Sequence, residues 1–339
     1  MNLFDFRSDT VTMPTEAMKK FMFEASLGDD VFGEDPTILS LESKMATMFG
    51  MEAALFCPSG TMTNQIAIKV HTRPGDEIIC ARQAHIYNYE GGGIAMLSGA
   101  SARLIERESG ILTESDIISN INMDDPHYPK TSLVCLENTS NRGGGCTYKI
   151  ADIKEIKKVC KQHGLNLHLD GARLFNALIA NNEIAKEYGS TFDSISICLS
   201  KGLGAPVGSV LLGNKNFIYN ARRVRKVFGG GMRQAGIIAA AGIFALDNHI
   251  ERLAEDHLNA ALIASASQKC KHVERVLPVE TNIIILVLKS GITAADFLKK
   301  LVDRGIRAVA MGPDRVRFVT HLDVTKIAVE KLVELLPAL

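Results

Sequence analysis

Residues 194–212 read SISICLSKGLGAPVGSVLL, in which two apolar runs flank a glycine-rich segment that contains Lys201. Each run is short and rich in Ile, Val, Leu or Cys, as buried strands are. Seven such runs, separated mostly by longer amphipathic segments, occur at Ala53–Cys57, Glu77–Ala81, Arg103–Glu106, Leu133–Leu136, Leu165–Leu169, Ser194–Leu199 and Val207–Leu212. Strands that are apolar on both faces and joined by helices predict an α/β fold, with a mostly parallel seven-stranded sheet between helices.

The length of 339 residues predicts a large domain with a smaller one attached. The clearest helix spans Asp152–Gln162, and an alanine-rich helical region spans Gln234–Gln268. The patterns beyond it predict a small α+β lobe, with strands at Thr281–Leu288 and Val316–Val319 and helices at Thr293–Arg304 and Val324–Leu336. We therefore expect an N-terminal segment that contributes to the active site (1–15), a large cofactor-binding domain (16–250) and a small C-terminal domain (251–339).

The composition is that of a globular protein, with 46% hydrophobic and 22% charged residues. Lys plus Arg and Asp plus Glu both number 38, so no net charge favours nucleic acid or an anionic membrane as a partner. The seven cysteines form no C-x-x-C pair and lie mostly in apolar runs, which indicates buried, reduced thiols. Since the sequence has no apolar N-terminal stretch and no run long enough to cross a bilayer, we expect a cytoplasmic protein.

Several common motifs do not fit. Gly202-x-Gly204 follows a strand, but the next glycine, Gly208, is misplaced for a dinucleotide fingerprint. Gly28 and Gly33 have the spacing of a phosphate loop, yet Glu34 stands where a lysine is needed. The sequence contains neither H-E-x-x-H nor G-x-S-x-G, and its cysteines lack zinc-ligand spacing. We therefore expect no metal-centred mechanism.

The remaining residues match the needs of pyridoxal phosphate, which are an amine, a carboxylate for the ring nitrogen, a phosphate cradle and a flat group against the ring. Lys201 supplies an amine for an imine, because it follows an apolar strand and its neighbouring glycines leave room for a cofactor. Asp170 supplies the carboxylate, since it follows Leu165–Leu169 and ligands of open α/β sheets gather at that edge. Taken alone, Lys201 is more simply a surface lysine, and Asp170 could equally be a helix N-cap.

Ser59-Gly60-Thr61 offers the phosphate cradle, where Ala53–Cys57 turns into a helix that begins near Met62. The free N–H groups and the dipole of a helix N-terminus favour a phosphate, although an ordinary capped turn explains this segment equally well. His85 offers the flat group, because it follows Glu77–Ala81 and precedes three glycines. A lone histidine is more often structural, so the prediction depends on the four pieces occurring together.

With these pieces in order, the chain resembles the low-specificity L-threonine aldolases, in the β-eliminating-lyase branch of the fold-type-I pyridoxal-phosphate enzymes. The resemblance covers nearly the full length. It is carried by Phe6–Thr12 (FRSDTVT), Gly28–Pro36 (GDDVFGEDP), Pro58–Thr61 (PSGT), Leu136–Thr139 (LENT), Leu169–Arg173 (LDGAR), Leu199–Gly208 (LSKGLGAPVG), Gly229–Gln234 (GGGMRQ) and Val319–Asp323 (VTHLD). It implies the fold-type-I transferase fold and pyridoxal 5′-phosphate as the cofactor.

The resemblance also implies roles for individual residues. The cofactor residues would be Lys201 as the imine lysine, Asp170 on the pyridine nitrogen, His85 against the ring, and Gly60 and Thr61 on the phosphate. Ser8, Arg173 and Arg317 would hold the substrate carboxylate, with Arg173 also counted among the cofactor contacts, because a guanidinium fork matches a carboxylate. Lys226 and Arg233 would reach the phosphate of a neighbouring subunit, in a homodimer that assembles into a homotetramer. The residues near the substrate side chain would be His127, Tyr89 and Glu90.

The implied activity is retro-aldol cleavage of L-threonine, L-allo-threonine or a related β-hydroxy amino acid to glycine and an aldehyde, with His85 and His127 as candidate bases. β-Elimination and transamination use the same cofactor and stay open as chemical alternatives. More distant alternatives are a protein that binds the cofactor without catalysis and a dinucleotide-dependent enzyme. Two segments, Tyr87–Tyr89 and Asn141–Cys146, differ from some relatives and could bear on substrate preference.

Overall fold

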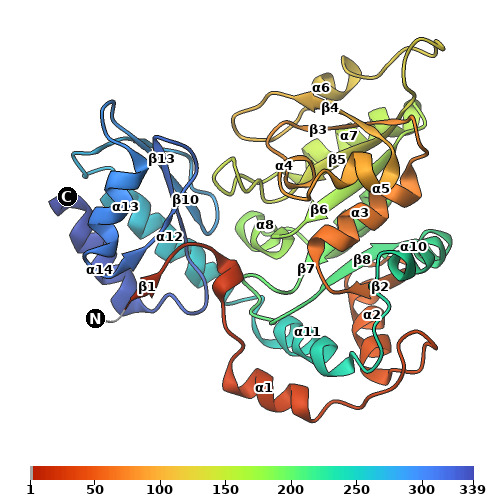
Figure 1. The fold of residues 1–339 in the computed structure, drawn as a ribbon, viewed down its shortest axis with the longest axis horizontal. Coiled ribbons are helices and arrows are strands. Elements are labelled where there is room, and N and C mark those ends of the chain that lie inside the picture. The colour runs from red at the N-terminus through yellow and green to blue at the C-terminus, as the bar shows by residue number, and fades with distance from the viewer. Residues whose placement is uncertain (1–2) are drawn as a thin grey trace.

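The computed structural model describes residues 3–339, and its main feature is a seven-stranded sheet in the order β2-β8-β7-β6-β5-β3-β4 (Figure 1). Its strands are β2 (Ala53–Cys57), β3 (Glu77–Ala81), β4 (Ser101–Ile105), β5 (Thr131–Glu137), β6 (Asn166–Gly171), β7 (Ser194–Cys198) and β8 (Ser209–Gly213). In this sheet β8 runs antiparallel to both of its neighbours, β2 and β7. The other five strands, from β7 through β6, β5 and β3 to β4, are parallel to one another. The predicted mostly parallel sheet is therefore confirmed, and each predicted run forms one strand.

Alternate side chains of the strands pack into two separate cores. Leu55 and Leu211 pack with α3 (Gly60–His71) and α10 (Lys215–Val227) on one face of the sheet. Phe56 and Val210, their neighbours in sequence, belong instead to the large core that includes α2 (Pro36–Phe49). This alternation follows from the two-residue period of a strand. Helices therefore cover both faces, as the apolar character of the strands predicts.

Other connections carry further helices of the large lobe. These are α1 (Glu16–Phe23), α4 (His85–Asn88), α5 (Gly93–Ser98), α6 (Glu114–Ile118), α7 (Ile150–Gln162), α8 (Leu174–Asn181) and α9 (Ala185–Thr191), with a 3₁₀ turn at Asp9–Val11. Helix α7 corresponds to the predicted helix Asp152–Gln162 and buries Ile153, Ile156 and Val159 on one face. Gly164 follows it with a φ of 66°, a left-handed conformation that favours glycine at the end of a helix.

The C-terminal lobe is a four-stranded antiparallel sheet packed against helices. Its strands are β9 (Val273–Val276), β10 (Ile283–Leu288), β12 (Val309–Ala310) and β13 (Arg315–Val319), in the order β12-β13-β10-β9. Side chains of α13 (Ala294–Val302) and α14 (Lys326–Ala338) share its core. The N-terminal strand β1 (Phe4–Asp5) pairs with β11 (Ile306–Arg307), so the start of the chain is attached to this lobe (Figure 1). The predicted small α+β lobe is confirmed, while the exact domain boundaries stay predictions.

The predicted helical region Gln234–Gln268 is two helices, α11 (Gly236–Asn248) and α12 (Leu253–Ser267). The break contains His249, which is buried and whose Nδ1 lies 2.7 Å from the carbonyl oxygen of Leu203. Helix α11 is apolar on nearly all sides, so its sequence has little helical periodicity to mark where it ends. The break between α11 and α12 is thus accompanied by a contact of His249 with Leu203, a residue far away in the sequence, and the local sequence does not indicate it.

Two further expectations concern the surroundings of the protein. All seven cysteines are buried and none forms a disulfide. Among residues 3–339, no helix is both long and apolar enough to span a membrane.

Candidate active site

A cavity of about 430 Å³ opens at the carboxyl ends of the parallel strands and is lined by both lobes. Its lining residues are Ser8, Thr10, His85, Tyr89, Asn141, Arg142, Arg173, Lys201, Val309, Ala310, Met311 and Arg317. Four of these, His85, Asn141, Arg173 and Lys201, follow β3, β5, β6 and β7, which are consecutive in the sheet. The fold therefore gathers these side chains at the sheet edge where α/β proteins bind ligands. Six residues predicted from the sequence line this cavity: Ser8, His85, Tyr89, Arg173, Lys201 and Arg317.

The first turn of α3 has the form of a phosphate cradle. Ser59 is its N-cap and accepts a hydrogen bond from the backbone N–H of Met62, and the helix begins at Gly60. A Cβ atom at Gly60 would lie 2.6 Å from Sγ of Cys198, so the close approach of β7 requires glycine here. The buried hydroxyl of Ser209 lies beside the same position and has no hydrogen-bond partner. An anion at this helix terminus would meet free N–H groups, which suits the phosphate of pyridoxal phosphate.

We expect Gly60→Ala to weaken cofactor binding about tenfold or more and to lower the free energy of unfolding by about 1–3 kcal/mol, because the new methyl group overpacks against Cys198. Cofactor titration and urea unfolding measure the two effects. The double variant Gly60→Ala with Cys198→Ala should recover much of both losses, since it removes the clashing sulfur. Equal losses in the single and double variants would show that crowding by Cys198 is not the cause.

Asp170 is a buried carboxylate with neutral hydrogen-bond donors around it. Its Oδ1 accepts from the backbone N–H of Ala172 at 3.1 Å, and its Oδ2 accepts from Nδ2 of Asn64 at 3.0 Å. No Lys or Arg of residues 3–339 lies within ion-pair distance of it. A buried carboxylate is stabilised by a positive partner. The protonated ring nitrogen of pyridoxal phosphate would supply one, so the residues fit this cofactor.

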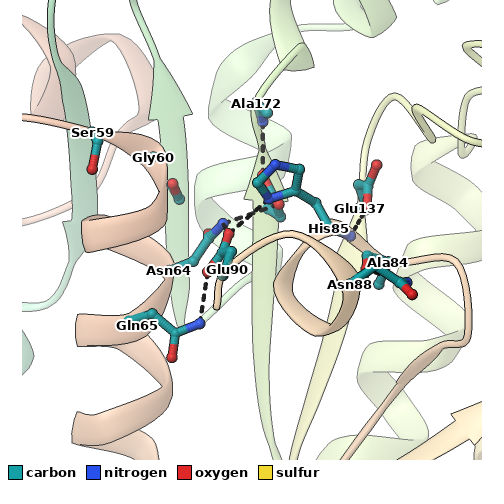
Figure 2. A network of polar contacts seen from close by, with 12 residues as sticks. Ser59, Gly60, Asn64, Gln65, Ala84, His85, Asn88, Glu90, Glu137 and Ala172 are labelled. Atoms are coloured by element: carbon teal, nitrogen blue, oxygen red, sulfur yellow. Dashed lines mark hydrogen bonds and ion pairs between the residues drawn. The ribbon is translucent and has the colours of Figure 1, made fainter. Parts of the chain in front are cut away.

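Glu90 lies between Asn64 and the imidazole of His85 and contacts both (Figure 2). Its Oε1 lies 2.9 Å from Nδ1 of His85 and accepts from Nδ2 of Asn64, and its Oε2 accepts from Nε2 of Gln65 at 2.6 Å. Burial alone lowers the pKa of His85, but the hydrogen bond to Glu90 and the nearby charge of Asp170 outweigh it and raise the pKa. The side chain of Glu90 is fully buried and does not line the cavity. Its contacts are with His85 and with Asn64 and Gln65 of α3.

A chain of polar side chains, which begins at the half-buried His71 and is otherwise buried, leads to Asn64. Oγ of Ser194 lies 2.8 Å from Nε2 of His71 and 2.8 Å from Nδ1 of His168, whose Nε2 lies 3.1 Å from Oδ1 of Asn64. Burial lowers the pKa of His71 to about 4 and that of His168 to about 3, so both rings are neutral near pH 7 and each carries one N–H. Since the amide N–H groups of Asn64 face Asp170 and Glu90, its oxygen must accept from His168. Every donor in this series of hydrogen bonds therefore points toward the carboxylates of Asp170 and Glu90. A flip of the Asn64 amide would break its hydrogen bonds to His168 and to both carboxylates.

The guanidinium groups of Arg173 and Arg317 differ in how they are neutralised. Arg173 donates from Nε and Nη2 to the two oxygens of the buried Asp9, both at 2.7 Å, and this pairing outweighs burial to hold the pKa of Asp9 well below its usual range. Arg317 donates to Oδ1 of Asn141 and to the carbonyl oxygen of Arg7, and its buried Nε has no partner. Burial and the charge of Arg173 lower the pKa of Arg317 to about 10. Arg317 therefore presents a charge that a carboxylate ligand would satisfy.

Glu137 links two sides of the cavity, and sequence reasoning gave it no role. It is the last residue of β5, is buried, and accepts from the backbone N–H of His85 at 2.7 Å and from that of Asn141 at 2.9 Å. Burial raises the pKa of its carboxyl, and the nearby Asp170 adds to this effect. Sequence reasoning likewise missed Asp9 and Asn64. The available signals were the position of Asp9 beside Ser8 and that of Asn64 one helical turn after Gly60.

Several predicted residues lie outside the cavity of this single chain. The side chain of His127 is 86% exposed, and its Nδ1 lies 2.7 Å from Asp125. Arg233 pairs with Asp29 at 2.9 Å, and Lys226 lines a separate surface cavity with Val31 and Tyr219. The structure therefore does not bring these three residues to the site within one subunit.

Comparisons with known proteins agree with this geometry. The model of the β-eliminating lyase family matches residues 5–290. Low-specificity L-threonine aldolase 1 of Arabidopsis thaliana is 42% identical over 332 residues, covering 96% of this chain and 93% of that protein. The low specificity L-threonine aldolase of Escherichia coli K12 is 42% identical over 325 residues, covering 96% and 95%. A solved structure of Leishmania major threonine aldolase has a TM-score of 0.85 at 23% identity and covers 99% of both chains, which establishes the fold.

Proposed function

This chain belongs to the β-eliminating lyase family, and we propose that it cleaves L-threonine or L-allo-threonine, and related β-hydroxy amino acids, to glycine and an aldehyde with the help of pyridoxal 5′-phosphate. The observation that carries the proposal is a single cavity that joins Lys201 and His85 to Arg317, a half-buried arginine with a buried, unpartnered Nε and no carboxylate partner among residues 3–339. An amine, a flat ring and an anchor for a carboxylate are what a cofactor-dependent reaction of an amino acid requires.

The cofactor would be held by residues from three parts of the large lobe. Gly60 and Thr61 would bind its phosphate at the start of α3, and Asp170 would pair with its ring nitrogen. His85 would lie against the ring, and Lys201 would be its covalent attachment. When bound, pyridoxal phosphate accepts the electron pair that is released when the Cα–Cβ bond of an amino acid breaks.

Arg317 would bind the carboxylate of the substrate, together with Ser8 and Arg173. The free Nε of Arg317 and the Asn141 and Arg7 contacts of its two Nη atoms fix where that carboxylate can lie. Asp9 in turn fixes the guanidinium of Arg173. Such anchoring orients the Cα–Cβ bond before it breaks, which is a large part of catalysis by positioning.

His85 or His127 would take the proton from the β-hydroxyl group, directly or through a water molecule. Nδ1 of His85 is engaged with Glu90, so Nε2 is the atom available on the ring that lines the cavity. As the hydroxyl proton leaves, Cβ becomes the aldehyde carbon and Cα receives a proton to give glycine. Tyr89 would lie beside the substrate side chain, whereas Glu90 would act through His85.

The pH dependence tests the role assigned to His85. A base must be neutral, so activity should rise as the pH passes through the pKa of His85, which Glu90 raises. In Glu90→Gln that pKa falls, so the rise in kcat/KM should begin at lower pH than in the wild type. In a His85→Asn background the same exchange should not move the rise. A rise at an unchanged or higher pH in Glu90→Gln would remove His85 as the base.

The active site would be completed in a homodimer, where Lys226 and Arg233 reach the phosphate site of the partner subunit, and two dimers would form a tetramer. Exposed apolar side chains near Lys226 support this, including Val31, Phe32, Tyr219 and Val227. The seven buried cysteines without a disulfide support a reducing compartment such as the cytoplasm.

The decisive experiment is to incubate the purified protein with L-threonine and identify the products. We expect a yellow protein that releases glycine and acetaldehyde in equal amounts. Release of 2-oxobutanoate would instead indicate β-elimination, and a colourless protein would favour a dinucleotide-dependent enzyme. A yellow protein that produces no aldehyde from any β-hydroxy amino acid would indicate binding without catalysis.

A further inference from the structure

The cavity has more positive charge than the reaction of threonine needs. Its lining includes four basic side chains, Arg142, Arg173, Arg317 and Lys201, and no carboxylate lines it in the described part of the chain. Arg173 is neutralised by Asp9. On the proposed function, Lys201 is used by the cofactor and Arg317 by the substrate carboxylate. Arg142 is left without an anion.

An aromatic ring and a thioether sulfur contact the guanidinium of Arg142, but neither neutralises its charge. Its guanidinium carbon lies 5.7 Å from the ring centre of Tyr89, and its Nη1 lies 3.6 Å from Sδ of Met311. No Asp or Glu of residues 3–339 lies within ion-pair distance of it. A guanidinium over an aromatic ring can still donate its remaining N–H groups to an anion that lies in the plane of the guanidinium. The side chain thus bridges the large lobe and the small lobe with its charge uncompensated.

Arg142 also separates the cavity from a second one of about 280 Å³, which is lined by Gln83, Asp314 and Arg315 among others. An anion on that outer side would meet the carboxylate of Asp314, and Arg315 on the same side is already paired with Glu108. On the inner side, the lining residues include no carboxylate. The electrostatic preference therefore favours an anion on the side of Arg142 that faces the substrate.

We propose that Arg142 is a subsite for a second carboxylate on the side chain of the substrate, so that the enzyme acts on β-hydroxy amino acids with an acidic side chain, of which 3-hydroxyaspartate is the simplest. This rests on the proposed function. The α-carboxylate occupies Arg317, and the side chain extends past Tyr89 to Arg142. Breaking the Cα–Cβ bond gives glycine and glyoxylate: the hydroxyl proton goes to the base, the electron pair goes to Cα, and Cα takes up one proton.

The test compares two substrates of the same shape with the holoenzyme. L-threo-3-Hydroxyaspartate carries the second carboxylate, and L-threo-3-hydroxyasparagine carries an uncharged amide in its place. Glycine release gives kcat/KM for each, and their ratio reports recognition of the charge alone. We expect the wild type to prefer the acid by about tenfold or more, as a charge-assisted hydrogen bond would give.

In Arg142→Gln the preference for the acid should be lost, and in Arg142→Lys part of it should remain, because lysine keeps the charge without the fork. Arg315→Gln is the matched control, since Arg315 lies on the outer cavity and pairs with Glu108, and the ratio should not change. If Arg142 only braces Tyr89, its loss would slow both substrates equally. An unchanged ratio in Arg142→Gln, or a wild type that prefers the amide, would overturn the subsite. Cleavage of L-threonine by the wild type tests the proposed function separately.

Discussion

Replacing Lys201 by alanine should reduce the cleavage of threonine by about three orders of magnitude or more and abolish covalent binding of the cofactor. Lys201 is the one lysine that lines the cavity of the described chain, and it follows β7 at the sheet edge, where it lines the cavity together with His85 and Arg173. The absorbance of the covalently bound cofactor and the rate of acetaldehyde release are the two measurements, and both should fall together.

Lys215 provides the matched control for this prediction. It also lies just after a strand, β8, but it is exposed at the start of α10. Lys215→Ala should keep the colour and the activity of the wild type. Thermal unfolding should show that both variants are folded. A Lys201→Ala variant that stays covalently yellow and active would place the cofactor on another lysine and would require a different site.

The strands of the large lobe were predictable because, apart from the edge strand β4, they are buried on both faces. β2 and β3 begin and end where the apolar runs do, since charged or turn-forming residues stand at their ends. The break between α11 and α12 was not predictable in the same way. Its position accompanies the contact of His249 with the carbonyl of Leu203, and an alanine-rich segment gives no periodicity against which such a break would stand out.

The candidate site was predictable as far as it depends on strand ends. His85, Arg173 and Lys201 follow three parallel strands of the same sheet, β3, β6 and β7, so the fold brings them to one edge without any knowledge of their contacts. The pairing of Arg173 with Asp9 joins residues from opposite halves of the chain and leaves no local pattern. Glu90 was placed near the substrate side chain, but its carboxylate contacts His85, Asn64 and Gln65. The sequence places Glu90 close to the site, but the direction in which its side chain points depends on how the surrounding side chains pack.

The second large effect is expected for Asp170→Asn, which removes the negative charge opposite the ring nitrogen but keeps the shape of the side chain. The rate of cleavage should fall about 10²–10³-fold, the usual cost of removing one electrostatic partner from a buried catalytic site. The variant should also bind the cofactor more weakly. Its amide would place an N–H group against Nδ2 of Asn64 or the N–H of Ala172, and Asn64 is fixed by His168. The mismatch therefore has no simple relief by a flip of the neighbouring amide.

Two measurements separate loss of charge from damage to the fold. The added stability that saturating cofactor gives to the protein should shrink in Asp170→Asn, because it depends on cofactor affinity, whereas the protein without cofactor should unfold at a similar temperature. Asp193→Asn is the control, since Asp193 accepts from the backbone of Leu167 near the opposite end of β6. It should lower stability without changing kcat/KM for threonine. If Asp170→Asn kept both the wild-type rate and the full stabilisation by cofactor, Asp170 would not be the partner of the ring nitrogen, and the buried carboxylate network behind His85 would need another purpose.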